Sequence, residues 1–598
     1  MFFDFIKRFR HRLASACSPT ALCLLYVLVA ASFVYFWANR EILANPYLIN
    51  DDVRQQIYWM QRWYDPGLFP DDLLTRYAQE YVPWGVQAVY WVASWFVEPV
   101  AFSNILTGIL YVISAGFFFG IGLRFRDDLT AVCVALSFFL CAAFLHKMAG
   151  GLSRSFVVPL LAAYLYFLSV DKVFAASAVI LVASFFNPYV FLLCVATHGL
   201  YVLHRFGPGM LRRILDRVDE NAPGLRLRDL VKRLSSLVPR AWLPSQEADP
   251  VCTPGHLLLL NLPFVAAMLV TAVLYGFCRS SELGGLVGWQ EMVGKIEYTS
   301  AGRYELVPVP SMLYEVIRPW LQNLFVGQWS ALWGILGIGA LAATVRYALG
   351  NRTHKVEWSS FTVFAYLFPA SLILYTFACV FVAKLFVPRR YIEYSLNFFY
   401  CISLAVCLRM VVARLNLRPV AFWGLTTLMV LLSAVRLHNM ELYDYSAHAG
   451  LFRFLQGTPK ESLIAGHPQM MDSIPTFALR KVFVNQELSH TWVQPYWSMI
   501  KKRTSDLFVA YYSDDPGEVR RFCKENGIAY MVVREEDFSR TSLTKGGIYF
   551  EPFDREIRTF TASRTDFALL NEKEFPRVYS DNGFFVVRID AGGEADRL

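Results

Sequence analysis

Long runs of apolar residues constrain the fold of this chain more than any other feature. Eleven runs come close to the roughly 20 residues that a helix needs to cross the hydrocarbon core of a bilayer. They lie at about 20–38, 103–123, 129–147, 155–170, 173–187, 188–204, 256–277, 327–348, 359–385, 391–409 and 419–436. Only 17% of the residues are charged, against about 25% in soluble globular proteins. The sequence therefore predicts a polytopic α-helical membrane protein with about eleven transmembrane helices.

One further segment, residues 83–100, is ambiguous. It contains Trp84, Trp91 and Trp95, and polar residues such as Glu98 interrupt it. An aromatic segment with polar interruptions is typical of a helix that lies in the membrane interface. Whether this segment spans the membrane decides on which side every later loop lies, so its placement has to agree with the distribution of basic residues.

Basic residues fix the expected orientation. Lys7, Arg8, Arg10 and Arg12 precede the first apolar run and place the N-terminus in the cytoplasm. If 83–100 does not span, the basic loops at 124–128, 205–255, 346–356 and 409–418 are all cytoplasmic. If it spans, all of them lie outside, against the positive-inside tendency. We therefore predict an interfacial helix at 83–100 within a first outer loop, 39–102, and a second large outer loop at 278–326.

The formal net charge of +8 follows from these loops and gives no indication of nucleic-acid binding. Residues 1–436 are thus predicted to form a transmembrane domain. From about 437 onward polar residues become frequent, and no further spanning run occurs. Short β-rich segments begin at Ser462, Lys481, Ala529 and Phe584, and a helix is expected after Asp515. This alternation predicts a non-cytoplasmic α/β domain over 437–598.

Two adjacent acids, Asp51 and Asp52, follow the first apolar run, and Arg54 lies two residues after Asp52. A carboxylate beside a membrane surface can take a proton from a hydroxyl group or bind a divalent cation. A solvated acidic loop is the alternative interpretation. The position in the loop after the first helix, among Gln, Arg and aromatic residues, favours a site.

Two further predicted outer segments carry cations. The turn after the third apolar run contains Lys147, Gly150, Gly151 and Arg154. Glycines allow a ligand to approach the backbone closely, and arginine can bind phosphate with two parallel hydrogen bonds. A simple turn between two helices explains the same residues.

The other segment is Arg389-Arg390-Tyr391, which lies between two apolar runs on the predicted outer side. A double arginine there runs against the positive-inside tendency and suits a phosphate at headgroup level. Snorkelling anchors at a helix end are the alternative.

Other polar groups point less clearly to a site. Arg303 and Tyr304 in the 278–326 loop, with nearby acids, could line a site, but a solvated loop is the favoured interpretation. His490 and Trp497 belong to an aromatic group that can stack on sugar rings, although a domain core is favoured.

An acidic pair in a large first outer loop, about eleven helices and a C-terminal outer α/β domain together resemble the GT-C superfamily of membrane glycosyltransferases. The acidic pair, the glycine turn and the double arginine look like those of a bacterial branch. The resemblance implies transfer of a sugar from a polyprenyl-phosphate donor to a lipid, glycan or protein acceptor on the outer face of the bacterial cytoplasmic membrane. It implies direct displacement with inversion, with Asp51 or Asp52 as the general base or as a ligand of Mg²⁺ or Mn²⁺. Arg54, Lys147, Arg154, Arg389, Arg390 and Tyr391 would bind the substrate and its phosphate.

Trp-Trp-Asp, the oligosaccharyltransferase signature, occurs nowhere in the chain, which favours transfer of a single sugar. Two other functions remain open. A secondary transporter or flippase of a lipid-linked or anionic substrate would carry ionisable residues near mid-membrane and show repeats, and here the charges gather at one rim. A scaffold with the same fold and no catalytic activity is the other alternative.

Overall fold

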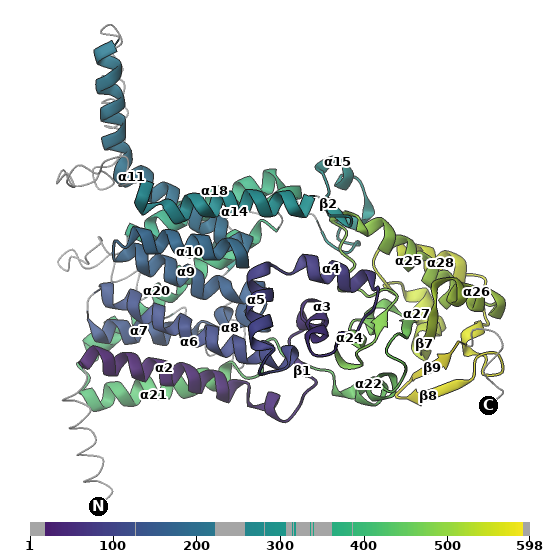
Figure 1. Ribbon diagram of the computed structural model, residues 1–598. Coiled ribbons are helices and arrows are strands. Elements are labelled where there is room, and N and C mark those ends of the chain that lie inside the picture. The colour runs from purple at the N-terminus through teal and green to yellow at the C-terminus, as the bar shows by residue number, and fades with distance from the viewer. Residues whose placement is uncertain are drawn as a thin grey trace, which may run out of the picture.

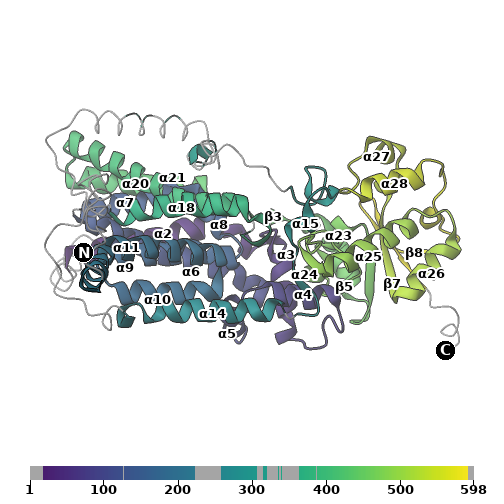
Figure 2. The same ribbon diagram turned by 90° about the horizontal axis from the view of Figure 1, so that it is seen from above.

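The computed structural model describes residues 18–125, 127–221, 258–279, 281–305, 362–385 and 387–589, with seven further residues between 314 and 342. Long helices run side by side, and an α/β unit lies at one end of them (Figures 1 and 2). Within the described residues, five helices are long and apolar enough to span a membrane, or six if one bent pair counts as a single span. The chain is a multi-pass membrane protein.

Helices occupy the apolar runs that the sequence identified, as far as the structure describes them. They are α2 (Pro19–Ala38), α6 (Pro99–Phe125), α7 (Asp128–Leu140), α8 (Ala142–Met148), α9 (Val157–Ser169), α10 (Val173–Phe186), α11 (Pro188–Asn221), α14 (Leu262–Arg279), α18 (Thr362–Val380), α20 (Arg389–Leu415) and α21 (Pro419–Arg436). Most of the predicted run at 327–348, the loop at 346–356, most of 205–255 and the basic N-terminus lie outside the described residues. The total of eleven spans stays a prediction.

The run at 129–147 departs from its expected form of one straight helix. α7 and α8 meet at Cys141 with a bend of 61°, because Cys141 leaves the helical conformation, with ψ at 89°. The break frees the carbonyl group of Leu140, and Arg436, which is buried at the end of α21, donates a hydrogen bond to it at 2.7 Å. A buried carbonyl needs such a partner, so Arg436 stabilises the bend.

Small residues let the helices approach one another closely. A Cβ atom on Gly122 of α6 would lie 2.5 Å from the Cα atom of Ala131 in α7. Only glycine allows this approach of two helices, as is common where helices pack within membranes. The contact fixes α7, and therefore α8 and the turn after it, against α6.

The segment between α2 and α6 folds at one end of the bundle. It contains β1 (Leu48–Ile49), α3 (Val53–Gln56), a 3₁₀ helix at Tyr58–Trp63, α4 (Leu73–Tyr81) and α5 (Trp84–Ala93). With ten residues, α5 is too short to span a bilayer, and it lies across the ends of the long helices (Figure 1). Trp84, Trp91 and Trp95 are exposed. The interfacial position of α5 stays a prediction.

The C-terminal part contains a five-stranded mixed sheet in the order β5-β4-β7-β9-β8. The strands are β4 (Leu463–Gly466), β5 (Lys481–Val482), β7 (Ile528–Arg534), β8 (Arg577–Asp581) and β9 (Phe584–Arg588). β4 pairs in parallel with β5 and β7, and β9 runs antiparallel to β7 and β8. The α/β character and the expected helix after Asp515, α26 (Pro516–Asn526), are confirmed. The domain boundary near 436 stays a prediction.

Two strand pairings join this part to other segments of the chain. β1 pairs antiparallel with β3 (Tyr443–Asp444), which follows the last long helix. β2 (Gly284–Leu286) pairs with β6 (Val493–Pro495). Both pairings bring loops that are distant in the sequence to the same end of the bundle.

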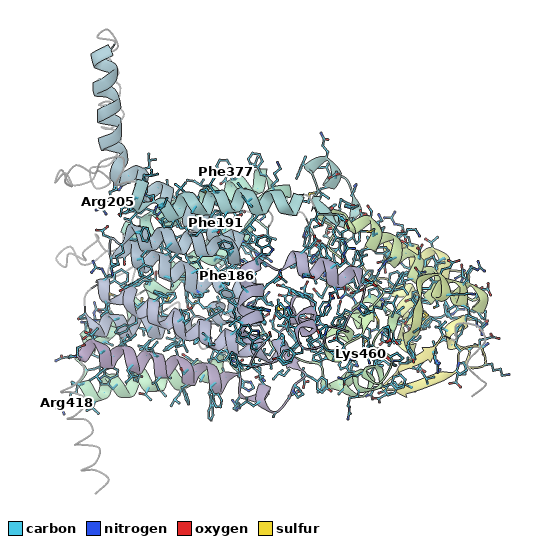
Figure 3. All side chains as sticks on the ribbon, viewed as in Figure 1. Phe186, Phe191, Arg205, Phe377, Arg418 and Lys460 are labelled. Carbon is cyan, nitrogen blue, oxygen red and sulfur yellow. The ribbon has the colours of Figure 1, made fainter. Side chains whose placement is uncertain are left out.

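Charged residues mark the two ends of the bundle. Arg205 and Arg418, which the predicted topology puts in the cytoplasm, lie at the end away from Lys460 of the C-terminal part (Figure 3). Phe186, Phe191 and Phe377 lie along the helices between these ends. The two arginines therefore share one end, as the positive-inside prediction requires.

Candidate functional site

The acidic pair lies where the first loop meets the segment after α21. Asn50 follows β1 and is buried, and its amide nitrogen donates to the carbonyl oxygen of Glu441 at 2.9 Å. The Asn50 side-chain oxygen accepts from the backbone nitrogen of Asp52 at 3.2 Å, which forms a tight turn. This turn presents Asp51 and Asp52 at the start of α3.

One oxygen of Asp51 is engaged and the other is not. Its Oδ1 atom forms an ion pair with Arg54 and accepts a hydrogen bond from the Tyr445 hydroxyl at 2.8 Å. Within the described part of the chain, the Oδ2 atom has no hydrogen-bond partner. The Asp51 side chain is 41% exposed. Asp51 is therefore held in place while one oxygen stays available to a substrate.

Arg54 is buried and committed to neighbouring groups. Its Nη1 atom donates to the Ser473 hydroxyl at 2.9 Å, and its guanidinium lies 4.4 Å from the centre of the Tyr445 ring. Together with the ion pair to Asp51, these contacts make Arg54 a support for the acid. A role of Arg54 in binding phosphate stays a prediction.

Both oxygens of Asp52 are engaged. The Oδ2 atom forms an ion pair with Arg154, and Oδ1 accepts from the side-chain amide of Gln55 at 2.8 Å. Arg154 also donates to the Asn50 side-chain oxygen at 3.1 Å. The Arg154 Nε atom is buried and has no hydrogen-bond partner among the described residues. The acidic pair and the turn that contains Gly150, Gly151 and Arg154 (the glycine turn) thus form one site.

The two glycines of the turn are required by this close approach. Gly150 has φ of +92°, and a Cβ atom there would lie 2.7 Å from the Asn50 side-chain oxygen. Gly151 has φ of +61°, and its Cβ atom would lie 2.5 Å from the Ser103 carbonyl oxygen. Both positions combine a left-handed backbone with contact to another segment, so they favour glycine.

Lys147 and Arg389 share one carboxylate that the sequence reasoning missed. Lys147 lies 2.9 Å from Glu393, and Arg389 lies 3.9 Å from the other oxygen of the same residue. Glu393 is buried in α20. Its signal in the sequence was an acid inside an apolar run, four residues after Arg389.

Arg390 differs from its neighbour because, among the residues that the structure describes, no carboxylate lies within ion-pair distance of it. Its guanidinium lies 5.1 Å from the centre of the Tyr189 ring. Tyr391 is buried, packs against Tyr189 with ring centres 5.2 Å apart and donates to the Leu385 carbonyl oxygen at 3.2 Å. Tyr391 is therefore part of the support for Arg390.

Tyr81, at the end of α4, connects the two halves of the site. Burial raises the pKa of Tyr81 to about 12, and the charges of Arg390, Asp52 and Arg154 also act on its phenol. The side chain still exposes 40% of its surface, so protein atoms crowd the phenol without sealing it from solvent. Charges from both halves of the site therefore act on this one phenol.

A second acidic group lies behind the first. Asp472 is buried, and this burial together with neighbouring Glu487 raises its pKa to about 8, although Arg54 and Arg303 act in the opposite direction. The backbone nitrogen of Glu487 donates to Asp472 at 2.9 Å. No local sequence pattern marked these two acids, because their partners come from distant segments.

The 281–305 loop is docked on the C-terminal part through Tyr298, Arg303 and Tyr304, whereas Glu291, Lys295 and Glu305 are exposed, as in the solvated loop that we favoured. Tyr298 is buried and donates to the Thr491 carbonyl oxygen at 2.5 Å. The Arg303 guanidinium lies 3.5 Å from Glu487, and the Tyr304 ring centre lies 4.2 Å from that of Trp492. The loop therefore forms part of the wall behind the acids.

The aromatic group of the C-terminal part is core, as favoured from the sequence. His490 and Trp497 are 3% exposed, and Tyr496 is fully buried. Tyr77 of α4 stacks on Tyr496 with ring centres 3.7 Å apart. These rings join the first loop to the C-terminal part.

The side chains around Asp51 and Asp52 offer few ligands for a bound metal ion. Within the described residues there is no group of three or more His, Cys, Asp or Glu side chains that could hold one. Arg154 and Arg54 already compensate the charges of Asp52 and Asp51. A divalent cation at Asp51 or Asp52 stays a prediction.

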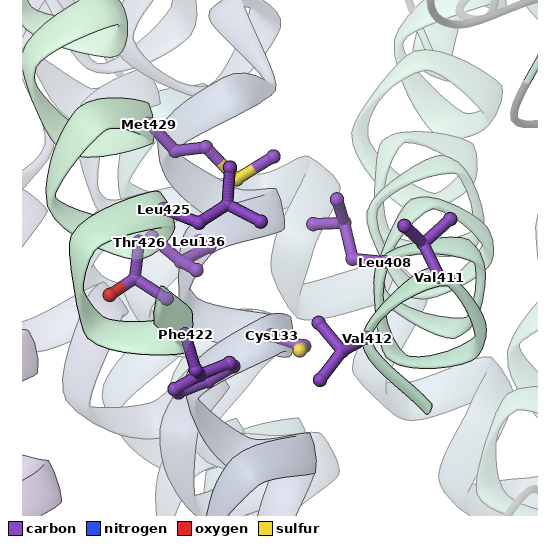
Figure 4. Close-up of a pocket in the computed structure, with 9 residues that line it drawn as sticks. All are labelled: Cys133, Leu136, Leu408, Val411, Val412, Phe422, Leu425, Thr426 and Met429. Carbon is purple, nitrogen blue, oxygen red and sulfur yellow. The ribbon is translucent and has the colours of Figure 1, made fainter. Parts of the chain in front are cut away.

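A small cavity between α7, α20 and α21 is unrelated to these charged residues. It has a volume of about 40 Å³, and Cys133, Leu408 and Phe422 are among the residues that line it (Figure 4). These positions are near the start of α7, the end of α20 and the start of α21, whereas the charged residues lie at the opposite helix ends. A volume this small is a packing gap.

The architecture has counterparts among solved structures. ArnT from Cupriavidus metallidurans bound to undecaprenyl phosphate superposes with a TM-score of 0.50 at 13% sequence identity, over 96% of this chain and 99% of that one. The chain has the GT-C fold. This confirms the resemblance drawn from the sequence at the level of the fold.

Two further solved structures are similar to this GT-C chain. The apo state of the same ArnT gives a TM-score of 0.48 at 12% identity, over 96% and 98% of the two chains. The archaeal oligosaccharyltransferase AglB from Archaeoglobus fulgidus, in complex with an inhibitory peptide and a dolichol-phosphate, gives 0.41 at 12% identity, over 87% and 70%. The fold assignment rests on the first superposition. No model of a known family and no curated protein sequence matches the chain.

Proposed function

We propose that this GT-C chain transfers a sugar from a polyprenyl-phosphate donor to a hydroxyl-bearing lipid, glycan or protein acceptor on the outer face of the membrane. The observation that carries the proposal is the assembly of Asp51, Asp52, Arg154 and Arg390 at one end of the bundle from separate segments. An acid with an available oxygen, near a cation that has no carboxylate partner among the described residues, suits a reaction that takes a proton from the acceptor and releases a lipid phosphate from the donor.

The cations suit the phosphate of the donor. Lys147 and Arg389 pair with one buried carboxylate, Glu393, and Arg390 lies over the Tyr189 ring, so these four side chains carry two net positive charges. A polyprenyl-phosphate sugar is a phosphodiester with one negative charge. When the bond between the anomeric carbon and the phosphate oxygen breaks, the departing polyprenyl phosphate gains negative charge. Cations already in place stabilise that charge without reorganisation.

Asp51 is the better of the two acids for the role of general base. Its free Oδ2 atom can accept the proton of the acceptor hydroxyl, whereas both oxygens of Asp52 are engaged. The acceptor oxygen then attacks the anomeric carbon from the side opposite the phosphate. One C–O bond forms, one breaks, the proton moves to Asp51, and the configuration inverts.

The likeness to ArnT with undecaprenyl phosphate supports the proposed class of donor. The arrangement of charges supports it independently, because a lipid phosphate at the membrane surface would meet Arg389 and Arg390 at the end of α20. The outer location follows from the predicted topology, in which the charged ends of these helices face away from the cytoplasm.

The test uses purified full-length protein in lipid nanodiscs and undecaprenyl phosphate as the probe. We expect saturable binding that is weakened when Arg390 is replaced, and transfer from polyprenyl-phosphate sugars that slows about 10²- to 10⁴-fold with Asp51→Asn. Asp65→Asn is the matched control, because Asp65 pairs with Lys460 on the surface. The proposal is refuted if the wild type neither binds undecaprenyl phosphate nor transfers any donor sugar.

A further inference from the structure

A chain of polar contacts connects the C-terminal part to the site. Glu487 lies between β5 and β6, and its Oε2 atom accepts from the Gln55 side-chain amide at 3.2 Å. The same amide nitrogen donates to Asp52 Oδ1 at 2.8 Å. Gln55 is 6% exposed, so these contacts lie within the protein.

The chain of contacts continues to the glycine turn, because the other oxygen of Asp52 forms the ion pair with Arg154. We propose that Glu487 and Gln55 are positioning residues that fix Asp52 and, through it, the guanidinium of Arg154. The inference rests on the proposed transferase function and adds to it a role for the C-terminal part, which completes the geometry of the site.

A neutral side-chain amide suits the position of Gln55 between the carboxylates of Asp52 and Glu487. Two carboxylates repel each other at close range, but an amide nitrogen carries two hydrogens and can donate to both. Alanine at position 55 would leave Asp52 and Glu487 without this donor. Glutamate there would put a third acid between them.

Glu487 is itself held by the protein. Its backbone nitrogen donates to Asp472 at 2.9 Å, and the guanidinium of Arg303 lies 3.5 Å from its Oε2 atom. The side chain is 18% exposed. Because these partners hold Glu487, it can fix the position of Gln55, which a mobile surface acid could not do.

We expect replacement of Glu487 to lower kcat. Arg154 acts on the departing phosphate in the transition state, and small displacements of such groups are costly. Lys147, Arg389 and Arg390, which bind the phosphate of the donor and stabilise the charge it gains, contact neither Glu487 nor Gln55 among the described residues. Glu487→Ala should therefore lower kcat roughly 10- to 100-fold, with little change in the KM for the donor.

Three comparisons separate this role from general destabilisation. Glu487→Gln should keep most of kcat, since its side-chain carbonyl can still accept from Gln55. The double variant Gln55→Ala/Glu487→Ala should be no slower than Gln55→Ala alone, because the two residues act in series. Glu297→Gln is the matched control, as Glu297 is a buried acid that pairs with Lys501 away from this chain of contacts.

A readout that does not require activity completes the test. Amide hydrogen exchange in nanodiscs should be faster at residues 150–156 in Glu487→Ala and unchanged there in Glu297→Gln. Unchanged exchange at 150–156, or losses in kcat that multiply in the double variant, would overturn the positioning role. If the wild type transfers no sugar, the proposed function fails, and the exchange data still decide the inference.

Discussion

The guanidinium of Arg154 forms an ion pair with the carboxylate of Asp52, although the six helices α3 to α8 separate the two residues in the sequence. The contact turns an acidic loop and a glycine turn into one site. Taken alone, the acidic pair could be a solvated loop, and the glycine turn could be a simple turn between two helices. The pairing is stabilised by Asn50, which contacts both partners.

Replacing Arg390 tests the donor site. Arg390→Ala should weaken the binding of undecaprenyl phosphate by roughly 10- to 100-fold, because a hydrogen bond to a charged group contributes about 1.5–3 kcal/mol. Arg390→Lys should recover part of the affinity, since it keeps the charge and loses the planar fork. Binding measured by tryptophan fluorescence in nanodiscs checks this, and equal affinity in all three proteins would contradict it.

Replacing Glu393 should strengthen the binding of undecaprenyl phosphate, whereas replacing Arg390 should weaken it. This carboxylate pairs with Lys147 and Arg389 and offsets one of their two positive charges in the absence of donor. Glu393→Gln should raise the affinity for undecaprenyl phosphate several-fold at low salt, because its negative charge no longer repels the phosphate. The gain should shrink as ionic strength rises. Weaker binding at every salt concentration would show that Glu393 positions the cations and does not compete with the phosphate.

The stability of the C-terminal part should depend on Asp472. Its folded-state pKa is raised to about 8, so the folded state holds a proton that the unfolded state releases near pH 4. Stability therefore falls as pH rises between these values. Asp472→Asn should raise the apparent Tm by roughly 2–4 °C at pH 8 and leave it unchanged near pH 4. A gain confined to low pH would contradict this assignment.

Arg436 should be needed for the bend between α7 and α8. Arg436→Met removes the donor to the buried Leu140 carbonyl, which costs about 1–3 kcal/mol. We expect a lower apparent Tm and weaker binding of undecaprenyl phosphate, because α8 carries Lys147. Arg418→Met, at the other end of α21, is the control. Identical thermal profiles for both variants would contradict the proposed role.

Much of the fold followed from local sequence patterns. Apolar runs located α2, α6, α20 and α21 because burial in a bilayer demands about 20 consecutive apolar residues. The break at Cys141 escaped this reasoning, since the composition stays apolar across it. β8 escaped as well, because most of this edge strand is exposed and polar.

The site was less predictable than the fold. Its acids and arginines were recognisable because they stand at the ends of apolar runs. Their partners were not, since Tyr445, Glu487 and Glu393 reach the site through tertiary contacts. Local patterns indicate which residues lie at a rim, and only the packing of distant segments shows which of them meet.

The most direct test of the account is the lipid profile of membranes that contain either the wild type or Asp51→Asn at equal levels. Mass spectrometry would measure polyprenyl-phosphate-linked sugars in both. The account predicts that Asp51→Asn slows the reaction about 10²- to 10⁴-fold, as expected for loss of a general base, so that an unused lipid-linked sugar accumulates. Identical profiles in the two membranes would contradict it.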